Sequence, residues 1–208
     1  TPIKSSAASD VYKRQVVEGA IDWRPHLVFP GLTAGARLDR RTTAPERARL
    51  LAADGQVLAE GPADTRSSPL AAAASIAGAL EAPADAAEQR ALYARGFPED
   101  TPVGVSGLER VFEQRLAGRP GGELLAGDRV VARSTPRRAE PVRTTIDPSV
   151  QEAADIALAG RLGGVAALDP RSGEIVALAG VAFSAPQPPG STFKIVTAAA
   201  ALEAGKVK

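Results

Sequence analysis

The hydrophobic and polar positions of residues 142–208 fall into blocks that predict a strand followed by a helix. Val142–Ile146 is rich in β-branched residues, which favour a strand. Asp147 is a typical helix N-cap, and Pro148 fits the first turn of the helix predicted over Val150–Leu158. This region therefore begins as a regular α and β segment.

A hairpin and a second helix follow. Two apolar runs, Gly164–Asp169 and Glu174–Ala179, flank a turn sequence and predict a hairpin whose strands are apolar enough to lie centrally in a sheet. Pro188–Gly190 then leads into residues 193–202, which are apolar on nearly every side. Such a helix is expected inside a protein, with Gly205 as its stop.

Residues 37–141 carry weaker patterns. Two short apolar runs within Ala48–Glu60 flank Asp54-Gly55, which predicts a hairpin with positive φ at both turn positions. Ala71–Leu80 and Ala84–Ala94 predict two modest helices separated by a proline. Gly121-Gly122 and Arg133–Pro141 predict a loop and a linker, because they are rich in Gly, Pro and Arg.

Residues 104–118 predict one amphipathic helix. Its apolar face would hold Leu108, Val111, Phe112 and Leu116, and its polar face Glu109 and Glu113. Four nearby arginines are expected to form a solvated face: Arg40, Arg41, Arg47 and Arg49.

Composition excludes several classes of function. The net charge of +1 gives no electrostatic case for nucleic acid, and no cysteine is present for a disulfide or a thiolate metal site. A single histidine, His26, excludes a His-rich metal site, so we expect no metal or cofactor. No stretch approaches the roughly 18 apolar residues of a membrane span.

Ser191 and Lys194 are the strongest candidates for chemistry. They lie three residues apart at the polar start of the apolar helix, so hydroxyl and amine share one face. A serine hydroxyl needs a base within hydrogen-bond reach, and a lysine amine serves as one when burial lowers its pKa. The Ser191 amide, near the helix start, could help to hold an oxyanion.

The same residues also fit a structural interpretation. Serine before a helix is a common N-cap, and a single lysine is usually a solvated charge. Roughly 0.3 Ser-x-x-Lys matches are expected by chance in a chain of this composition. The catalytic interpretation therefore depends on the surrounding residues.

Those surroundings resemble the active-site serine segment of penicillin-binding proteins, and among them class B, the monofunctional transpeptidases. The resemblance rests on Pro189–Lys194 (Pro-Gly-Ser-Thr-Phe-Lys), on Thr197 and on Ala200–Gly205. It implies that Ser191 is the acylated nucleophile and Lys194 the general base.

Other segments are similar to the same family. Residues 142–174 resemble the opening of the transpeptidase fold, and Ser106–Glu109 (Ser-Gly-Leu-Glu) resembles a segment before it. Ala48–Glu60 resembles the family's Arg-Gly-x-Ile-x-Asp-Arg-Asn-Gly hairpin more loosely, because that glycine and asparagine are not kept.

The resemblance implies a multidomain α+β protein, with a pedestal or dimerisation domain followed by the first part of a serine transpeptidase, β-lactamase-like domain. We assign 37–141 to the pedestal domain and 142–208 to the transpeptidase domain. Residues 16–36, with short apolar bursts broken by prolines, would be the remnant of a membrane-proximal extension. Residues 1–15 resemble translated sequencing-adapter sequence, so we expect a non-native or disordered leader.

The implied activity is D,D-transpeptidation of peptidoglycan. The partners would be stem peptides, β-lactams and cell-wall synthesis or division proteins, at the extracytoplasmic face of the bacterial membrane. The family completes its site with downstream Ser-x-Asn and Lys-Thr-Gly motifs, and only fourteen residues follow Lys194. We therefore expect a fragment, inactive by itself, in which Lys194 is solvated.

Two alternatives remain open. A β-lactam sensor or serine β-lactamase shares the Ser-x-x-Lys helix, although the long N-terminal region with Ser106–Glu109 argues against it. A non-catalytic cell-wall scaffold would use 37–141 to bind a partner, with Ser191 incidental.

Overall fold

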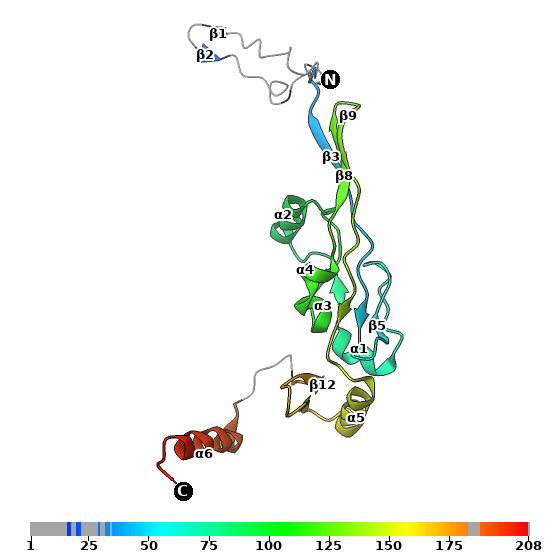
Figure 1. The fold of residues 1–208 in the computed structure, drawn as a ribbon. Coiled ribbons are helices and arrows are strands. Elements are labelled where there is room, and N and C mark those ends of the chain that lie inside the picture. The colour runs from blue at the N-terminus through cyan, green and yellow to red at the C-terminus, as the bar shows by residue number, and fades with distance from the viewer. Residues whose placement is uncertain are drawn as a thin grey trace, which may run out of the picture. The chain divides into compact units, whose positions relative to one another are not determined.

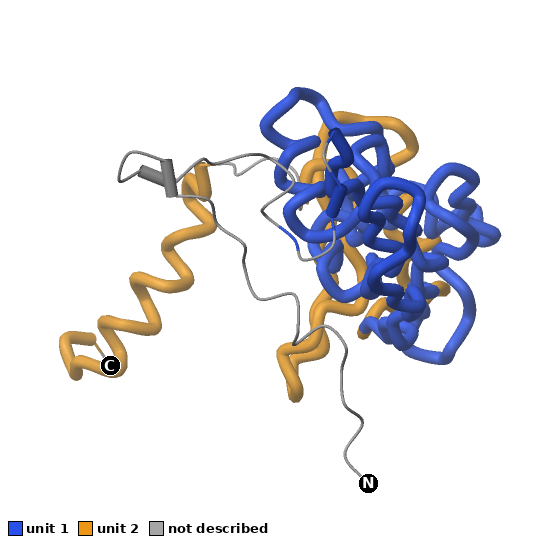
Figure 2. Tube along the Cα trace, turned by 90° about the horizontal axis from the view of Figure 1, so that it is seen from above, with its two compact units in different colours: residues 1–144 blue, residues 145–208 orange. Residues whose placement is uncertain are grey.

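The computed structural model describes residues 16–17, 20–21, 29, 32–33, 35–182 and 188–207. They fall into two compact units, 1–144 and 145–208, which Figure 2 draws in separate colours. Both units mix helices and strands, so the predicted mixture of α and β structure is confirmed (Figure 1). Most of the residues assigned to the leader and to the membrane-proximal extension lie outside the described part of the chain.

Three antiparallel strands form one sheet of the first unit. β3 (Leu38–Thr43) pairs with β8 (Gly121–Ala126), and β8 pairs with β9 (Arg129–Ser134). The prediction of a loop at Gly121-Gly122 is therefore wrong, because the glycines begin β8. The predicted linker is wrong only at its start, because Arg133 and Ser134 lie in β9 and 135–141 lie in no helix or strand. A two-residue turn, Gly127-Asp128, joins β8 to β9.

A second sheet contains the predicted hairpin. β4 (Leu50–Leu51) pairs antiparallel with β5 (Val57–Ala59), and β10 (Val142–Arg143) pairs in parallel with β4. The turn differs from the prediction, because Gly55 has a positive φ of 92° and Asp54 does not. The Gly55 amide donates to the Ala52 carbonyl, and the Ala52 amide to the Gln56 carbonyl. This is a three-residue loop with its glycine in the left-handed region.

Helix α1 (Ala71–Ala77) ends earlier than predicted, because the chain turns at Gly78 and forms β6 (Leu80–Glu81). β6 pairs antiparallel with β7 (Val103–Gly104). A Cβ atom at Gly78 would lie 2.1 Å from the carbonyl oxygen of Ser106, so only glycine fits there.

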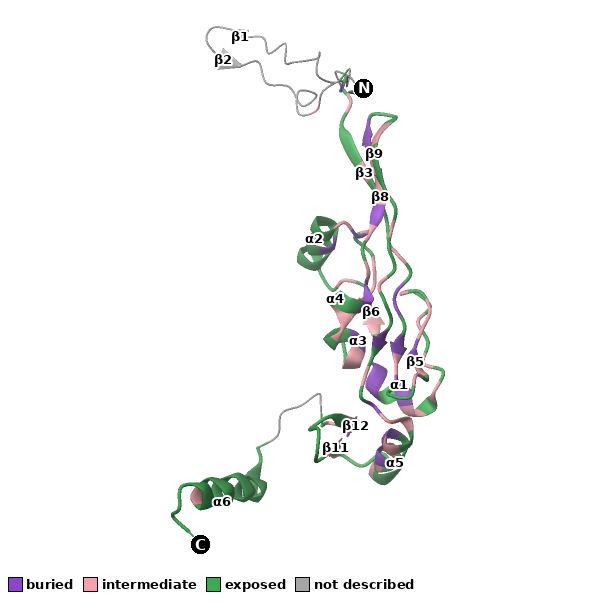
Figure 3. Ribbon diagram, in the orientation of Figure 1, coloured by how far each residue is buried: buried purple, intermediate pink, exposed green. Residues whose placement is uncertain are grey.

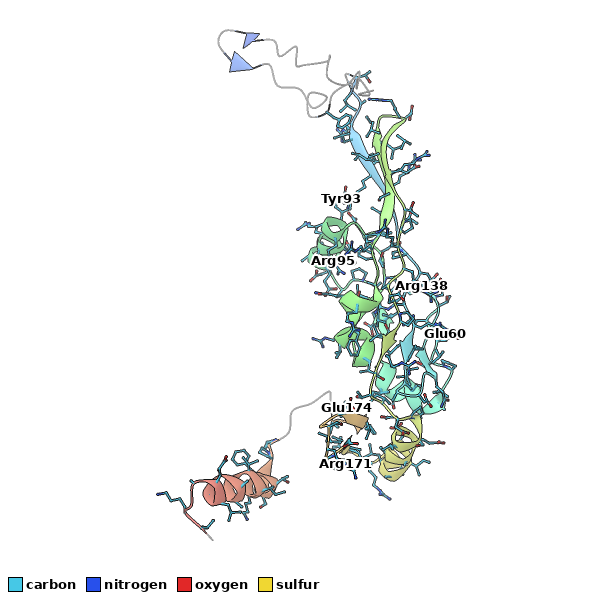
Figure 4. The ribbon with its side chains drawn as sticks, in the orientation of Figure 1. Glu60, Tyr93, Arg95, Arg138, Arg171 and Glu174 are labelled. Atoms are coloured by element: carbon cyan, nitrogen blue, oxygen red, sulfur yellow. The ribbon has the colours of Figure 1, made fainter. Side chains whose placement is uncertain are left out.

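Helix α2 (Ala86–Arg95) matches its prediction closely. Asp85 caps its start by accepting hydrogen bonds from two backbone amides, and Gly96 ends it in the left-handed conformation. Its last turn carries Tyr93 and Arg95 (Figure 4). The Arg40 guanidinium of β3 lies 3.6 Å from the centre of the Tyr93 ring and donates to the Tyr93 carbonyl, which joins α2 to the sheet.

The predicted helix over 104–118 is two short helices, α3 (Gly107–Val111) and α4 (Glu113–Leu116), broken at Phe112. The predicted faces are also wrong. Leu116 is buried, but Val111 is 71% exposed and Glu109 only 1% exposed. Glu109 points inward because two arginines meet its carboxylate there.

Those arginines form a buried ionic network with Glu109 and Glu113. Arg47 Nε donates to Glu109 Oε2 at 2.7 Å, and Arg66 Nε donates to Glu109 Oε1 at 2.8 Å. Arg47 Nη2 also donates to Glu113 Oε2 at 2.8 Å. Arg47 is 3% exposed, so the prediction of a solvated arginine face is wrong at this position. Burial lowers the pKa of Arg66, and the Glu109 carboxylate opposes this effect.

In the second unit, α5 (Pro148–Leu158) packs on a hairpin of β11 (Gly164–Leu168) and β12 (Ile175–Gly180), as predicted. The core between them is small and alanine-rich: Ala154, Ala177 and Ala179, with Val150, Leu158, Val165 and Ala167 packed against it. Leu168 is 56% exposed and Ile175 41% exposed, so the predicted central burial of both strands is not found in the described residues.

Two polar side chains of α5 fix this arrangement. Asp147 caps the helix by accepting from the Ser149 and Val150 amides, as predicted. Gln151, 1% exposed, donates from Nε2 to the Leu178 carbonyl at 2.8 Å and accepts at Oε1 from the Leu178 amide at 2.9 Å. The Gln151 amide therefore pairs with β12 as a neighbouring strand would.

Candidate active site

The candidate serine segment begins with one tight turn. η3 (Gly190–Phe193) is a 3₁₀ turn, and α6 (Lys194–Glu203) continues directly from it. Gly190 has a positive φ of 53°, which agrees with its predicted role in a sharp start. Ser191 therefore lies in the first turn, and Lys194 is the first residue of the α-helix proper.

The end of α6 is a Schellman motif. The Gly205 amide donates to the Leu202 carbonyl, the Lys206 amide donates to the Ala201 carbonyl, and Gly205 has a positive φ of 64°. The predicted stop at Gly205 is confirmed. The helix thus has well-formed local signals at both ends.

The predicted burial of this helix is not found in the described residues. Every residue of 188–207 is exposed except Ala201, which is half-buried (Figure 3). Among the large apolar side chains, Phe193 is 55% and Ile195 73% exposed. Local signals are enough to form a helix, but burial requires packing surfaces from elsewhere in a protein.

Ser191 and Lys194 lie close in sequence but are not engaged with each other. Within the described part of the chain, neither side chain makes a hydrogen bond or an ion pair. The Lys194 side chain is exposed to solvent. The helix in this form presents a nucleophile and an amine without the desolvation that would activate them.

The described residues offer no metal site. They contain no group of three or more His, Cys, Asp or Glu side chains that could hold a metal ion. No described helix has the length and apolar character to span a membrane.

Comparison with known proteins places the candidate residues inside a family match. The model of the penicillin binding protein transpeptidase domain matches residues 163–208, a span that includes Ser191 and Lys194. The peptidoglycan D,D-transpeptidase MrdA of Acinetobacter baumannii is 38% identical over 82 residues, covering 36% of this chain and 12% of MrdA.

Two solved structures share the fold. PBP2 of Pseudomonas aeruginosa, in complex with WCK 5153, has a TM-score of 0.60 at 24% identity, covering 82% of this chain and 43% of the other. PBP2 of Helicobacter pylori, in complex with MreC, has a TM-score of 0.53 at 12% identity, covering 69% and 43%. The chain therefore spans less than half the length of each of these relatives.

Residues 163–208 are thus similar to the penicillin binding protein transpeptidase domain, and the fold is similar to that of PBP2. The matches to MrdA and to PBP2 agree with the sequence resemblance to class B penicillin-binding proteins.

Proposed function

We propose that this chain carries the nucleophile and the base of a peptidoglycan D,D-transpeptidase, in an α+β protein with a pedestal unit before the transpeptidase domain. The observation that supports this most directly is the transpeptidase-domain match over 163–208, which contains Ser191 and Lys194. The similarity to MrdA supports peptidoglycan as the substrate.

The proposed reaction has two steps. Ser191 Oγ attacks the carbonyl carbon of the D-Ala-D-Ala amide, Lys194 takes the hydroxyl proton, and the amide bond breaks. The proton passes to the leaving amine of the terminal D-Ala, which departs and leaves an ester on Ser191. An amine of a second stem peptide then attacks the ester carbonyl carbon, and the bond to Ser191 Oγ breaks as the amide cross-link forms. The proton lost by the attacking amine returns through Lys194 to Ser191 Oγ. A β-lactam would acylate the same oxygen.

We propose further that the 208-residue chain is not acylated by itself. Lys194 is exposed, and the apolar face of α6 has no cover among the described residues. Activation would require packing that excludes water from Lys194. A fluorescent penicillin tests this directly, since stoichiometric labelling of the isolated chain at Ser191 would refute it.

A chimera tests the catalytic assignment separately. Residues 163–208 replace the aligned segment of A. baumannii MrdA, and unaltered MrdA sets the reference for fluorescent penicillin labelling. We expect the chimera to be labelled and Ser191→Ala to abolish the label. Lys194→Arg should slow labelling by roughly a hundredfold or more, because a guanidinium group does not act as the base.

The matched control is Ser172→Ala, which removes an exposed serine from the turn between β11 and β12. It should label as the chimera does. Full labelling of Ser191→Ala, or equal loss in Ser172→Ala, would contradict the assignment of Ser191.

We also propose an extracytoplasmic, cell-wall location and a protein partner for the first unit. The support is the fold shared with H. pylori PBP2, which is described in complex with MreC. Retention of the 208-residue chain on immobilised MreC, compared with a column that carries an unrelated protein, tests this. Equal retention on both columns would remove the support.

A further inference from the structure

A hollow of about 390 Å³ lies on the sheet formed by β3, β8 and β9, away from the serine segment in sequence. Its volume falls within the range of small-molecule sites, roughly 300–1,000 Å³. Six of its eight lining residues carry a charge or a hydroxyl group, namely Arg41, Thr43, Glu123, Arg133, Ser134 and Thr135, and Gly122 and Pro136 complete the lining.

The strand register brings three charged side chains into one row. Arg41 of β3 lies opposite Glu123 of β8, and Glu123 lies opposite Arg133 of β9, so all three project from the same face. Arg133 Nε binds Glu123 Oε1 at 2.8 Å. Arg41 makes no ion pair or side-chain hydrogen bond with any described residue. The row therefore carries one positive charge in excess, on an exposed guanidinium group.

Two glycines let the neighbouring segments approach β8 closely beside the hollow. A Cβ atom at Gly121 would lie 2.3 Å from the backbone nitrogen of Pro136, and one at Gly122 would lie 2.1 Å from the Arg41 carbonyl oxygen. The backbone of both neighbouring segments therefore closes against β8. Of the exposed hydroxyl residues that line the hollow, Thr43 shares a face of β3 with Arg41, and Thr135 follows the end of β9.

We propose that this hollow binds an oxyanion carried on a hydroxyl-rich small molecule, namely an acidic sugar or a sugar phosphate. The planar guanidinium group of Arg41 presents two parallel donors, which match a carboxylate or a phosphate. The hydroxyl side chains can donate to and accept from sugar hydroxyl groups. The site lies wholly within the first unit and does not depend on acylation of Ser191.

Calorimetric titration of the 208-residue chain tests the site with three probes: glucuronic acid, glucose 1-phosphate and glucose. We expect binding of at least one acidic probe and none of glucose, and the two acidic probes distinguish a carboxylate from a phosphate ligand. Arg41→Gln should weaken that binding by roughly tenfold or more. Arg41→Lys keeps the charge but loses the paired donors, so its affinity for the acidic probe should lie between those of Arg41→Gln and the unaltered chain.

Arg129→Gln is the matched control, because Arg129 is an exposed arginine on the same sheet that does not line the hollow. It should change the affinity by less than about twofold, as expected for a screened charge outside the site. Equal losses in Arg129→Gln and Arg41→Gln, equal affinity for glucose, or no binding of either acidic probe would each overturn the proposal. Because Arg41 is exposed, circular dichroism of Arg41→Gln should match that of the unaltered chain.

Discussion

Glutamine in place of Glu109 should destabilise the first unit strongly. Glu109 is 1% exposed, and its two carboxylate oxygens accept from Arg47 at 2.7 Å and from Arg66 at 2.8 Å. Glutamine keeps the shape but removes the charge, and it turns one acceptor into a donor that faces a guanidinium group. Arg47 would keep Glu113, whereas Arg66 would keep only carbonyl partners.

The size of the effect follows from burial. Removal of one partner from a buried ion pair costs about 3–5 kcal/mol, because a charge is left uncompensated away from water. The free energy of unfolding of an ordinary domain is about 5–15 kcal/mol, so Glu109→Gln should remove a large share of the stability of the first unit. The free energy of unfolding is measured by urea titration, and hydrogen exchange of peptides from 103–118 assigns the loss to this unit.

Glu123→Gln is the control for that measurement. Glu123 pairs with Arg133 at the same 2.8 Å, but the two side chains are 31% and 72% exposed. Exposed pairs contribute about 0–1 kcal/mol, so the control should be nearly neutral. If Glu109→Gln cost no more than Glu123→Gln, the buried network would not be what holds α3 to the rest of the unit.

Three further predictions concern other positions. Gln151→Leu should lower the free energy of unfolding by about 1–3 kcal/mol, because both backbone groups of Leu178 lose their partner. Hydrogen exchange across β12 should become faster, and unchanged exchange would exclude the pairing role of Gln151. Asp147→Ala should cost about 1 kcal/mol of helix capping. Hydrogen bonds from the Ser149 hydroxyl and from the Val150 and Ser149 amides lower the pKa of Asp147. The stabilisation by Asp147 is therefore present above the unfolded-state pKa and is lost as pH falls through the folded-state pKa. A difference in free energy of unfolding between wild type and Asp147→Ala that stayed constant during an acid titration would contradict this. Gly78→Ala should destabilise far more than Gly35→Ala, since both have positive φ but only at Gly78 would the Cβ meet a backbone oxygen, at 2.1 Å; equal unfolding midpoints would refute the steric argument.

Local signals predicted the elements that local interactions form. Asp147-Pro148 started α5, Gly96 and Gly205 ended their helices, and the apolar runs on either side of Asp169–Gly173 formed a hairpin. In each case the required partner lies within a few residues, so the sequence window contains the whole interaction.

The sequence-based predictions that are wrong mostly involve residues whose contacts lie far away in the sequence. Helical periodicity places Glu109 on the polar face because it compares only near neighbours, whereas Arg47 and Arg66 lie 62 and 43 residues away. The hairpin of β8 and β9 did have a signal, since Gly127-Asp128 between two apolar runs is a common two-residue turn. The burial of the serine helix was inferred from its apolar composition, which shows that the helix can be covered but not what covers it.

The side-chain amide of Gln151 helps to determine which edge of the β11–β12 sheet can pair with another strand. Along the outer border of β12, the Leu178 backbone is taken by Gln151, and the Val176 carbonyl by the Asp147 amide. Any additional strand must therefore align along β11 instead. Gln151 thus anchors the helix and occupies part of this edge, so its loss would loosen the helix and free the Leu178 backbone groups for another strand.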